Sequence, residues 1–313
     1  MIVSRDASGA AGATAATAAT EATEATQDHP LVRLALLTLV VAVFALLIAL
    51  PLAVVLTGAF RHGVAAYVQR VTDPLTLSAL RLTLVVVAVA VPVNIAFGLG
   101  AAWAIGKFDF PGRSALVTLI DLPFAVSPVI SGLAFVLLFG GRSAIGPWLV
   151  AHNIRIVFAT PGIVLATVFV TFPFVARELI PVFEARGTID EEAAIVSGAS
   201  GWQTFWRVTL PSARWALLSG VALAVARAAG EFGAVSVVSG HIRGRTNTLP
   251  LHVEVLYDSY DSTGAFAVAS LLVAVALPTL VVRWAIEWRE ESVARGGRVR
   301  DDSAAQIASA EAA

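Results

Sequence analysis

Six long apolar stretches limit what this chain can fold into more than any other feature of its sequence. They cover residues 34–56, 82–105, 115–139, 156–175, 215–238 and 265–286, and each is close to the roughly 20 residues that a helix needs to cross a bilayer. Hydrocarbon offers the backbone no hydrogen-bond partner, so a spanning segment must satisfy its own amide groups as a helix. A hydrophobic share of 58% and a charged share of 14% are also typical of a membrane protein. The sequence therefore predicts an all-α membrane protein with six transmembrane helices within residues 30–288.

The two ends of the chain differ from this apolar middle. Residues 1–29 are mostly Ala, Thr and Gly with scattered acidic residues, and such side chains bury too little apolar surface to offset the entropy of ordering. We expect this segment to be a disordered cytoplasmic tail. Residues 289–313 are charged and then rich in Ala and Ser, and we expect a flexible cytoplasmic tail there as well.

The basic residues predict the orientation, because cytoplasmic loops carry an excess of Arg and Lys. With the amino terminus in the cytoplasm, thirteen basic residues lie inside, among them Lys107 and Arg177, and seven lie outside. The remaining one, Arg227, falls within the fifth apolar stretch. Both termini are therefore expected to be cytoplasmic.

Composition and motifs exclude several classes of function. A net charge of −1 gives no basic surface for nucleic acid, and the absence of cysteine excludes disulfides and thiolate chemistry. The sequence contains no GxxxxGK[ST] phosphate-binding motif and no HExxH metal motif. His241 and His252 are eleven residues apart without a clear third ligand. We therefore expect no catalytic residue, no metal site and no cofactor on this chain.

A charged and aromatic stretch, residues 192–211, separates the fourth and fifth apolar stretches and reads EAAIVSGASGWQTFWRVTLP. In the orientation above it lies in the cytoplasm. One interpretation is a docking element for another protein, with a sharp turn at Gly198, since glycine permits such a turn. The other is an amphipathic surface helix with Trp202, Phe205 and Trp206 at the lipid headgroups, where aromatic rings are favoured.

The spacing within this stretch resembles the EAA loop of ABC importer permeases, in which E-A-A is followed at fixed intervals by G, an aliphatic residue, L and P. The matching residues, with the aromatic residue that lies among them, are Glu192, Ala193, Ala194, Gly198, Phe205, Val208, Leu210 and Pro211. The resemblance implies two short helices joined by a turn at the glycine, seated in a groove of an ATP-hydrolysing subunit. It assigns this set of residues to coupling with the ATPase.

The fifth apolar stretch carries Arg227 and Glu231, which lie four residues apart and hence on one face of a helix. Charged side chains are costly at membrane depth unless they pair or face a hydrated interior. In one interpretation Arg227 helps an anion across the membrane, and in the other it is a structural partner of Glu231. With the small residues Gly230 and Gly233, which let another helix approach closely, these residues form a candidate pathway or bundle-core set.

Prolines interrupt two other stretches. The third contains Asp121, Pro123, Ser127 and Pro128, and the second contains Pro92 and Asn94. Proline removes a backbone donor and clashes with the preceding turn, so these helices are expected to kink or partly unwind. Irregular backbone at membrane depth is buried in protein or lines a cavity. Ser127 and Pro128 are therefore candidates for a translocation pathway, with kinks absorbed by neighbouring helices as the alternative.

The run ARAAGEFGAVSVVSGHIRGRTNTLPLHVEVLYDSY, residues 226–260, is similar to the CysW-type permeases of sulfate and thiosulfate importers. This resemblance implies a type I ABC importer permease in the bacterial inner membrane that hydrolyses nothing itself. It also implies a sister permease, two copies of a cytoplasmic ATPase that bind ATP and Mg, and an extracytoplasmic sulfate-binding protein.

Two alternatives stay open. A molybdate or tungstate permease shares the R-A-x-G-E-F-G-A core of residues 227–234, and these tetrahedral dianions resemble sulfate. A secondary transporter driven by an ion gradient would use broken helices near the midplane, but it would not account for the EAA spacing.

Overall fold

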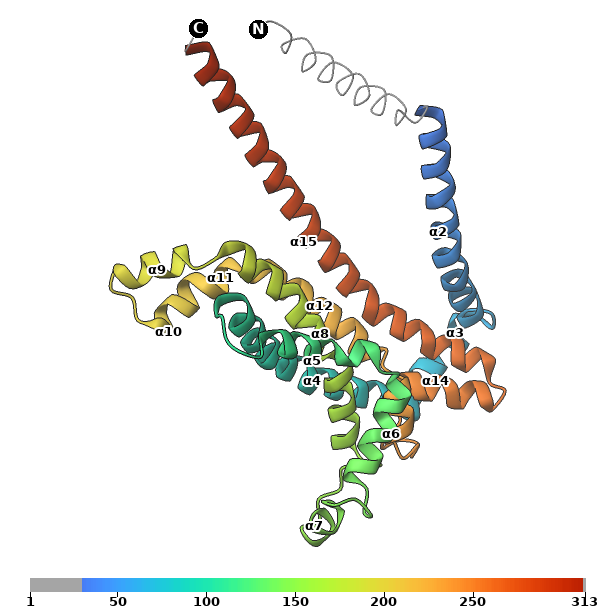
Figure 1. Ribbon diagram of the computed structural model, residues 1–313. Coiled ribbons are helices and arrows are strands. Elements are labelled where there is room, and N and C mark those ends of the chain that lie inside the picture. The colour runs from blue at the N-terminus through green and yellow to red at the C-terminus, as the bar shows by residue number, and fades with distance from the viewer. Residues whose placement is uncertain (1–29, 312–313) are drawn as a thin grey trace, which may run out of the picture. The chain divides into compact units, whose positions relative to one another are not determined.

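The computed structural model describes residues 30–311, and this part of the chain consists of helices and their connections, without a strand (Figure 1). The predicted tail of residues 1–29 lies outside the described residues. In chain order the helices are α2 (Pro30–Ala59), α3 (Gly63–Val71), α4 (Pro74–Lys107), α5 (Arg113–Ala125), α6 (Pro128–Phe139), α7 (Gly146–Ala151), α8 (Thr160–Arg186), α9 (Ile189–Val196), α10 (Gly201–Thr204), the π-helix η1 (Phe205–Thr209), α11 (Leu210–Ser212), α12 (Arg214–Ala229), α13 (Gly233–Val238), α14 (Leu249–Asp258) and α15 (Ser262–Glu311). The chain divides after Val54 into two units, and the arrangement below is that of the second.

Four of the described helices, α2, α4, α8 and α15, are long and apolar enough to cross a membrane. Two bent pairs, α5 with α6 and the α10–α11 segment with α12, raise the number to six if each pair forms one span. The all-α membrane fold predicted from the sequence is confirmed. The connection between the last two spans contains the short helix α14, whose residue Leu251 is fully buried.

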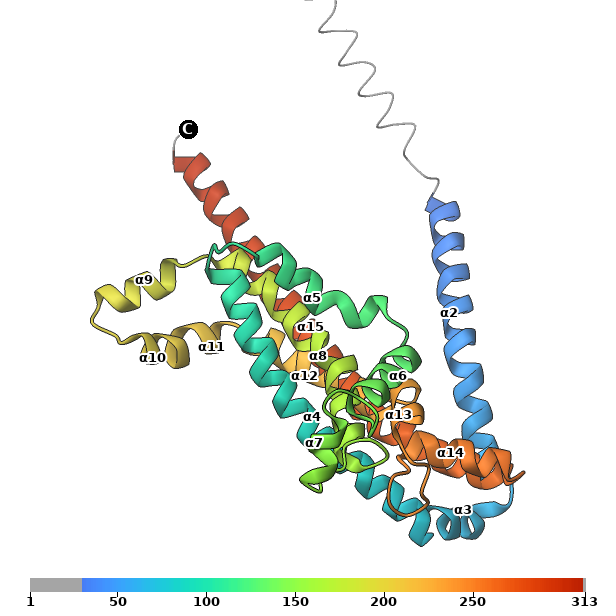
Figure 2. The same ribbon diagram turned by 60° about the horizontal axis from the view of Figure 1, so that its bottom comes forward.

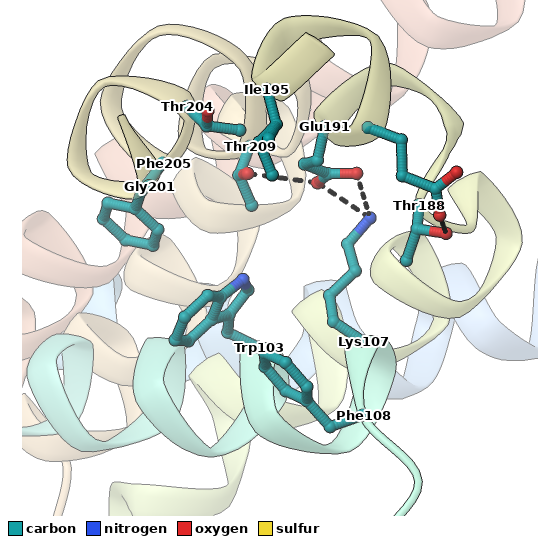
Figure 3. Close-up of a pocket in the computed structure, with 11 residues that line it drawn as sticks. Trp103, Lys107, Phe108, Thr188, Glu191, Ile195, Gly201, Thr204, Phe205 and Thr209 are labelled. Carbon is teal, nitrogen blue, oxygen red and sulfur yellow. Dashed lines mark hydrogen bonds and ion pairs between the residues drawn. The ribbon is translucent and has the colours of Figure 1, made fainter. Parts of the chain in front are cut away.

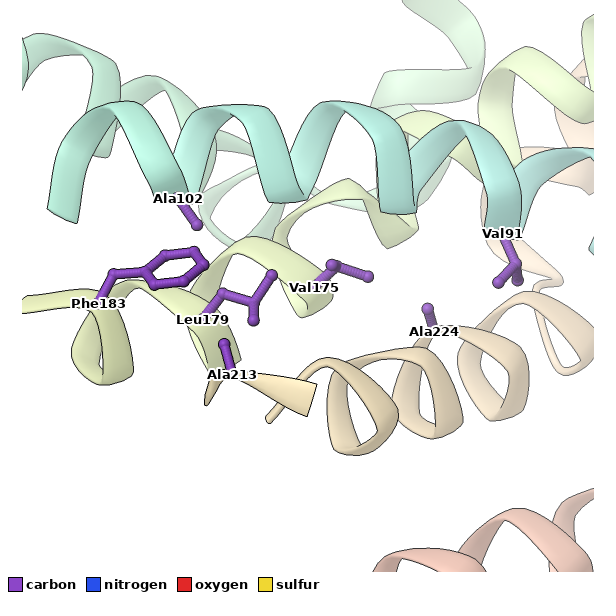
Figure 4. Close-up of a cluster of buried hydrophobic side chains, with 7 residues drawn as sticks. All are labelled: Val91, Ala102, Val175, Leu179, Phe183, Ala213 and Ala224. Atoms are coloured by element: carbon purple, nitrogen blue, oxygen red, sulfur yellow. The ribbon is translucent and has the colours of Figure 1, made fainter. Parts of the chain in front are cut away.

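Close contact between α4 and α8 forms the core. Gly98, Ala102 and Gly106 recur every four residues along α4. A Cβ added at Gly98 would clash with Val175 of α8, and one added at Gly106 would clash with Phe183 of α8. Such small-residue spacing lets two helix backbones approach closely. The buried cluster that results also includes residues of α12 and of the turn before it (Figure 4), and its members are Val91, Ala102, Val175, Leu179, Phe183, Ala213 and Ala224.

Two spans are broken, although the sequence predicts one of them as a single helix. The third span bends by 106° between α5 and α6, as its prolines predict. The fifth is not continuous, because α12 ends at Ala229 and α13 begins at Gly233. The prediction of one helix that carries both Arg227 and Glu231 is therefore wrong. Glycines at positions 230 and 233 weaken a helix at this point, and the Glu231 carboxylate accepts a hydrogen bond from the Ala234 amide at 2.9 Å, so that it caps α13.

The second span does not unwind at its proline, since α4 continues through Pro92. Nearby, the buried Asn94 donates a hydrogen bond to Thr171 of α8 at 2.6 Å. The last span also continues further than the apolar pattern indicates. Where the sequence predicts a flexible tail from residue 289, α15 runs to Glu311, through a segment rich in the good helix formers Ala, Arg and Glu.

Gly106 and Gly100 offer a matched test of the α4–α8 contact. A Cβ at Gly106 would clash with the Phe183 Cβ, whereas one at Gly100 would meet nothing within 4 Å. Alanine raises helix propensity by about 1 kcal/mol at either position, but overpacking costs about 1–3 kcal/mol. We expect Gly106→Ala to lower the melting temperature of the purified protein in detergent and Gly100→Ala to leave it unchanged or raise it. Equal melting temperatures for the two variants would contradict this account of the core.

Candidate functional site

The stretch that resembles the EAA loop forms a helix, a turn and a second helical segment. Helix α9 ends at Val196, the chain turns at Gly198, and α10 continues into η1 and α11. Ser200 begins α10 with a capping box, in which its hydroxyl accepts from the Gln203 amide while the Gln203 side chain accepts from the Ser200 amide. In both views of the ribbon, α9, α10 and α11 project together from one end of the helical bundle (Figures 1 and 2). We refer to residues 188–211 as the loop.

The turn depends on Gly198. Its φ of +90° lies in the left-handed region, which residues with a Cβ rarely adopt. A Cβ at this position would meet nothing within 4 Å, so the backbone conformation, and not the available space, favours glycine here.

The loop exposes several large apolar side chains. Val196 is 88% exposed, Trp202 72%, Ile195 56% and Trp206 50%. Large exposed apolar side chains gathered on one segment are typical of a protein or membrane contact. Of the residues assigned to coupling, Glu192, Ala193, Gly198 and Pro211 are exposed or partly exposed, and Ala194, Phe205, Val208 and Leu210 are half-buried.

The inner side of the loop meets the end of α4 (Figure 3). The Lys107 ammonium lies 2.9 and 3.1 Å from the two carboxylate oxygens of Glu191, and it also donates to the Gly187 carbonyl. Thr209 of η1 donates to Glu191 at 3.0 Å. Glu192, the acidic residue of the EAA pattern, instead accepts from Thr188 at 2.6 Å. A pocket of about 230 Å³ lies beside these contacts, between the loop and the end of α4.

Sequence reasoning missed this ion pair. From the sequence, Lys107 enters only the count of cytoplasmic charges, and Glu191 lies one residue before the matched pattern. One signal was present, since Lys107 is the single lysine in a chain whose other basic residues are all Arg.

The two broken spans meet each other. A Cβ at Gly233, the first residue of α13, would lie 3.0 Å from Pro128, the first residue of α6, and one at Gly132 would lie 2.6 Å from the Ala234 carbonyl. The structure thus brings Pro128 and Gly233 into contact. Both are residues that the sequence predicts for a pathway. Ser127 is the last residue before α6, and Gly230 is the first residue after α12.

Arg227 and Glu231 bridge the break in the fifth span. The Arg227 Nη1 lies 2.5 Å from the Glu231 Oε2, and the other carboxylate oxygen accepts from the Ala234 amide. Arg227 lies in the last turn of α12 and Glu231 just before α13, so each charge is favourable for the helix end that it adjoins. The Glu231 side chain is 1% exposed and that of Arg227 35%. The geometry favours structural pairing, with part of the guanidinium still accessible.

A second charged pair lies part-way along two spans. Arg177 of α8 contacts Asp121 of α5 through two hydrogen bonds, at 2.8 and 3.1 Å, and its guanidinium stacks on the Phe124 ring at 5.0 Å. The apolar pattern predicts Arg177 in a cytoplasmic loop, whereas the structure places it within α8 because that helix extends to Arg186. The Arg177 and Asp121 side chains are 58% and 36% exposed. Exposed charges within a span require water or another protein next to them.

The two histidines between the last two spans, His241 and His252, form hydrogen bonds. The buried His252 ring lies 3.2 Å from the Thr76 hydroxyl, and His241 lies 2.8 Å from the Ser236 carbonyl. Burial lowers the pKa of His252 below its usual 6.5, so this residue is neutral at pH 7. Within the described residues, no three His, Cys, Asp or Glu side chains form a group that could hold a metal ion.

Comparison with known proteins places this geometry in context. Residues 94–295 match the model of a family described as binding-protein-dependent transport system inner membrane component. The chain is 49% identical over 254 residues to the sulfate transport system permease protein CysW of Escherichia coli (strain K12), covering 81% of this chain and 87% of that protein. It is 50% identical to the CysW of Synechococcus elongatus, over 83% of this chain and 91% of that protein. It is 37% identical to the E. coli permease CysT, over 74% and 84% of the two chains.

Among solved structures, a chain of a bacterial alginate ABC transporter, in complex with an alginate pentasaccharide-bound periplasmic protein, has a similar fold. The TM-score is 0.65 at 16% sequence identity, and the match covers 83% of this chain and 94% of that one.

The Arg227–Glu231 pair gives a prediction that is independent of function. Arg227→Met leaves a carboxylate that is 1% exposed without its counter-charge, and breaking a buried pair costs about 3 kcal/mol. In the double variant Arg227→Met with Glu231→Gln, no charge remains and the amide oxygen still accepts from Ala234. We expect the double variant to melt at a higher temperature than Arg227→Met alone. If the two substitutions instead lowered the melting temperature additively, the pair would not be structural.

Proposed function

The chain belongs to the family of binding-protein-dependent transport system inner membrane components, and we propose that it works as the CysW-type permease subunit of an ATP-driven sulfate importer. The observation that carries this proposal is the high identity to sulfate permeases over most of the chain, which is higher for CysW than for CysT. The helix–turn–helix loop with its exposed apolar surface supports the ATP-driven class. The chain is a multi-pass inner membrane protein and a transport subunit, and we propose that both termini lie in the cytoplasm.

The partners follow from this class. We propose that the chain pairs with a CysT-like sister permease, that two copies of a cytoplasmic ATPase bind beneath the two permeases, and that an extracytoplasmic sulfate-binding protein delivers the anion. ATP and Mg would bind to the ATPase copies and not to this chain. The separate relatives named CysW and CysT support a pair of different permeases.

The loop is the part of this chain that would contact the ATPase. It exposes Val196, Trp202 and Trp206, and aromatic side chains commonly contribute much of the binding energy at protein interfaces. Closure of the ATPase subunits on ATP would move the loop, and the helical bundle would change from inward-open to outward-open to accept the anion.

The meeting of the two broken spans is the proposed lining of the pathway. Backbone groups freed by a helix break require protein or water as partners, and here the breaks adjoin each other at Pro128 and Gly233. Ser127, Gly230 and the accessible part of Arg227 lie at the same breaks. The Glu231 carboxylate cancels much of the charge of Arg227, so the accessible guanidinium N–H groups would offer an anion hydrogen bonds with only weak net attraction.

Uptake measurements test the substrate. We expect cells that lack this chain to lose uptake of labelled sulfate and to regain it when the chain is restored, because the chain forms half of the proposed pathway. Excess unlabelled thiosulfate should compete and molybdate should not. Restored uptake of molybdate in place of sulfate would keep the ABC permease class and overturn the substrate.

Gly198 and Gly201 test the docking surface as a matched pair. A Cβ added at either position would meet nothing within 4 Å, but of the two only Gly198 has a positive φ. Alanine at Gly198 therefore strains the turn by about 1–2 kcal/mol, while alanine at Gly201 adds no strain. We expect Gly198→Ala to reduce both the amount of ATPase that co-purifies and the uptake of sulfate, and Gly201→Ala to leave both unchanged. Full ATPase binding by Gly198→Ala would argue against docking through this turn.

A further inference from the structure

Two side chains of α4 attach the loop to the helical bundle from below. Trp103 and Lys107 are four residues apart and therefore share one face of α4. The Trp103 ring packs edge-on against Phe205 at a centroid distance of 5.7 Å, and Lys107 forms the ion pair with Glu191. The loop is thus held at η1 by an aromatic contact and at α9 by an ionic one (Figure 3).

The ionic contact is well shielded from solvent. The Lys107 side chain is 6% exposed and that of Glu191 16%, so water and salt screen this pair poorly. A comparable pair at the same end of the bundle, Arg113 with Glu184, is much more open, at 37% and 46%. The pocket beside Lys107 leaves the rest of this interface loosely packed, so few other contacts hold α9 to α4.

The Glu191 carboxylate contacts more than one segment of the chain. Glu191 accepts from Thr209 of η1 as well as from Lys107 of α4, and Lys107 also binds the carbonyl of Gly187, the residue that ends α8. Lys107 therefore joins α4 directly to the start of the loop, and through Glu191 to η1 near its end. Covalently, the loop continues only into α8 and α12, so α4 can follow the loop only through noncovalent contacts.

We propose that Lys107 is a positioning residue for coupling: through Glu191 it makes α4 move with the loop when the docked ATPase displaces it. Helix α4 is suited to carry such a displacement, because it is unbroken from Pro74 to Lys107 and packs along its length on α8. This inference rests on the proposed function of the loop. It assigns Glu191 to the contact with α4 and leaves the exposed apolar side chains Val196 and Trp206 to the ATPase.

The test uses the whole complex, reconstituted in lipid vesicles, with four variants of this chain. Lys107→Gln and Lys107→Glu break the ion pair, and Lys107→Glu with Glu191→Lys restores it in reverse. Glu184→Gln breaks the more exposed pair at the same end of the bundle and serves as the matched control. For each variant, the amount of ATPase bound, the rate of ATP hydrolysis and the uptake of labelled sulfate are measured on one preparation.

We expect Lys107→Gln to bind the ATPase normally and to hydrolyse ATP, but to take up at least about fivefold less sulfate per ATP, a typical size for lost coupling between sites. The reversed pair should recover much of this ratio relative to Lys107→Glu, and Glu184→Gln should match the wild type. An unchanged ratio in Lys107→Gln, or a reversed pair no better than Lys107→Glu, would overturn the proposal. Loss of the ATPase from Lys107→Gln would also overturn it, since Lys107 would then support the docking surface itself.

A second measurement separates this inference from the proposed function. If the wild-type complex takes up no sulfate, the proposed substrate fails, and amide hydrogen exchange in α9 then decides the role of Lys107. Faster exchange of residues 189–196 in Lys107→Gln, but not in Glu184→Gln, would support the anchoring of α9 by Lys107. Equal exchange in the two variants would exclude it.

Discussion

The close packing of α4 on α8 is the contact on which the other features of this chain depend. Glycine and alanine at 98, 102 and 106 let the two helices approach until Val175 and Phe183 touch the α4 backbone region. In a bilayer the hydrophobic effect does not favour association of apolar helices, so fit between surfaces and short polar contacts have to do so. The Asn94–Thr171 hydrogen bond is one such contact. Since α8 leads into the loop and α4 ends beneath it, the packing of α4 on α8 also determines where the loop lies.

The broken spans show how a charged pair can be accommodated where charge is costly. The four-residue spacing of Arg227 and Glu231 predicts that they share a helix. Instead, they close a gap between two helix ends of opposite polarity. Each charge thereby gains a favourable helix terminus in addition to its partner. The exposed pair of Arg177 and Asp121 has no such helix ends, and it requires water or a second subunit beside it.

Much of the fold and part of the site could be predicted from the sequence. Apolar runs of membrane length indicated the spans, because backbone hydrogen bonding in lipid leaves few other structures, and the prolines at 123 and 128 indicated the bend between α5 and α6. The break after Ala229 was missed, since the apolar pattern continues through it, although Gly230 and Gly233 weaken a helix there and the packing of α13 on α6 leaves little room for a side chain at Gly233. The Lys107–Glu191 pair joins residues far apart in the sequence, so no local pattern predicts it. The EAA spacing predicted the helix–turn–helix form of the loop but not the side chains of α4 on which it packs.

The identity of the residue beneath the loop has a chemical consequence. Lys107 carries the only side-chain primary amine in the chain, and it is held as an ammonium between a carboxylate and a carbonyl with little solvent contact. An acylating reagent must reach the amine nitrogen, which Glu191 and Gly187 cover for as long as the loop rests on α4. Acylation of Lys107 therefore reports when the loop and α4 separate, and no label has to be introduced to detect this separation.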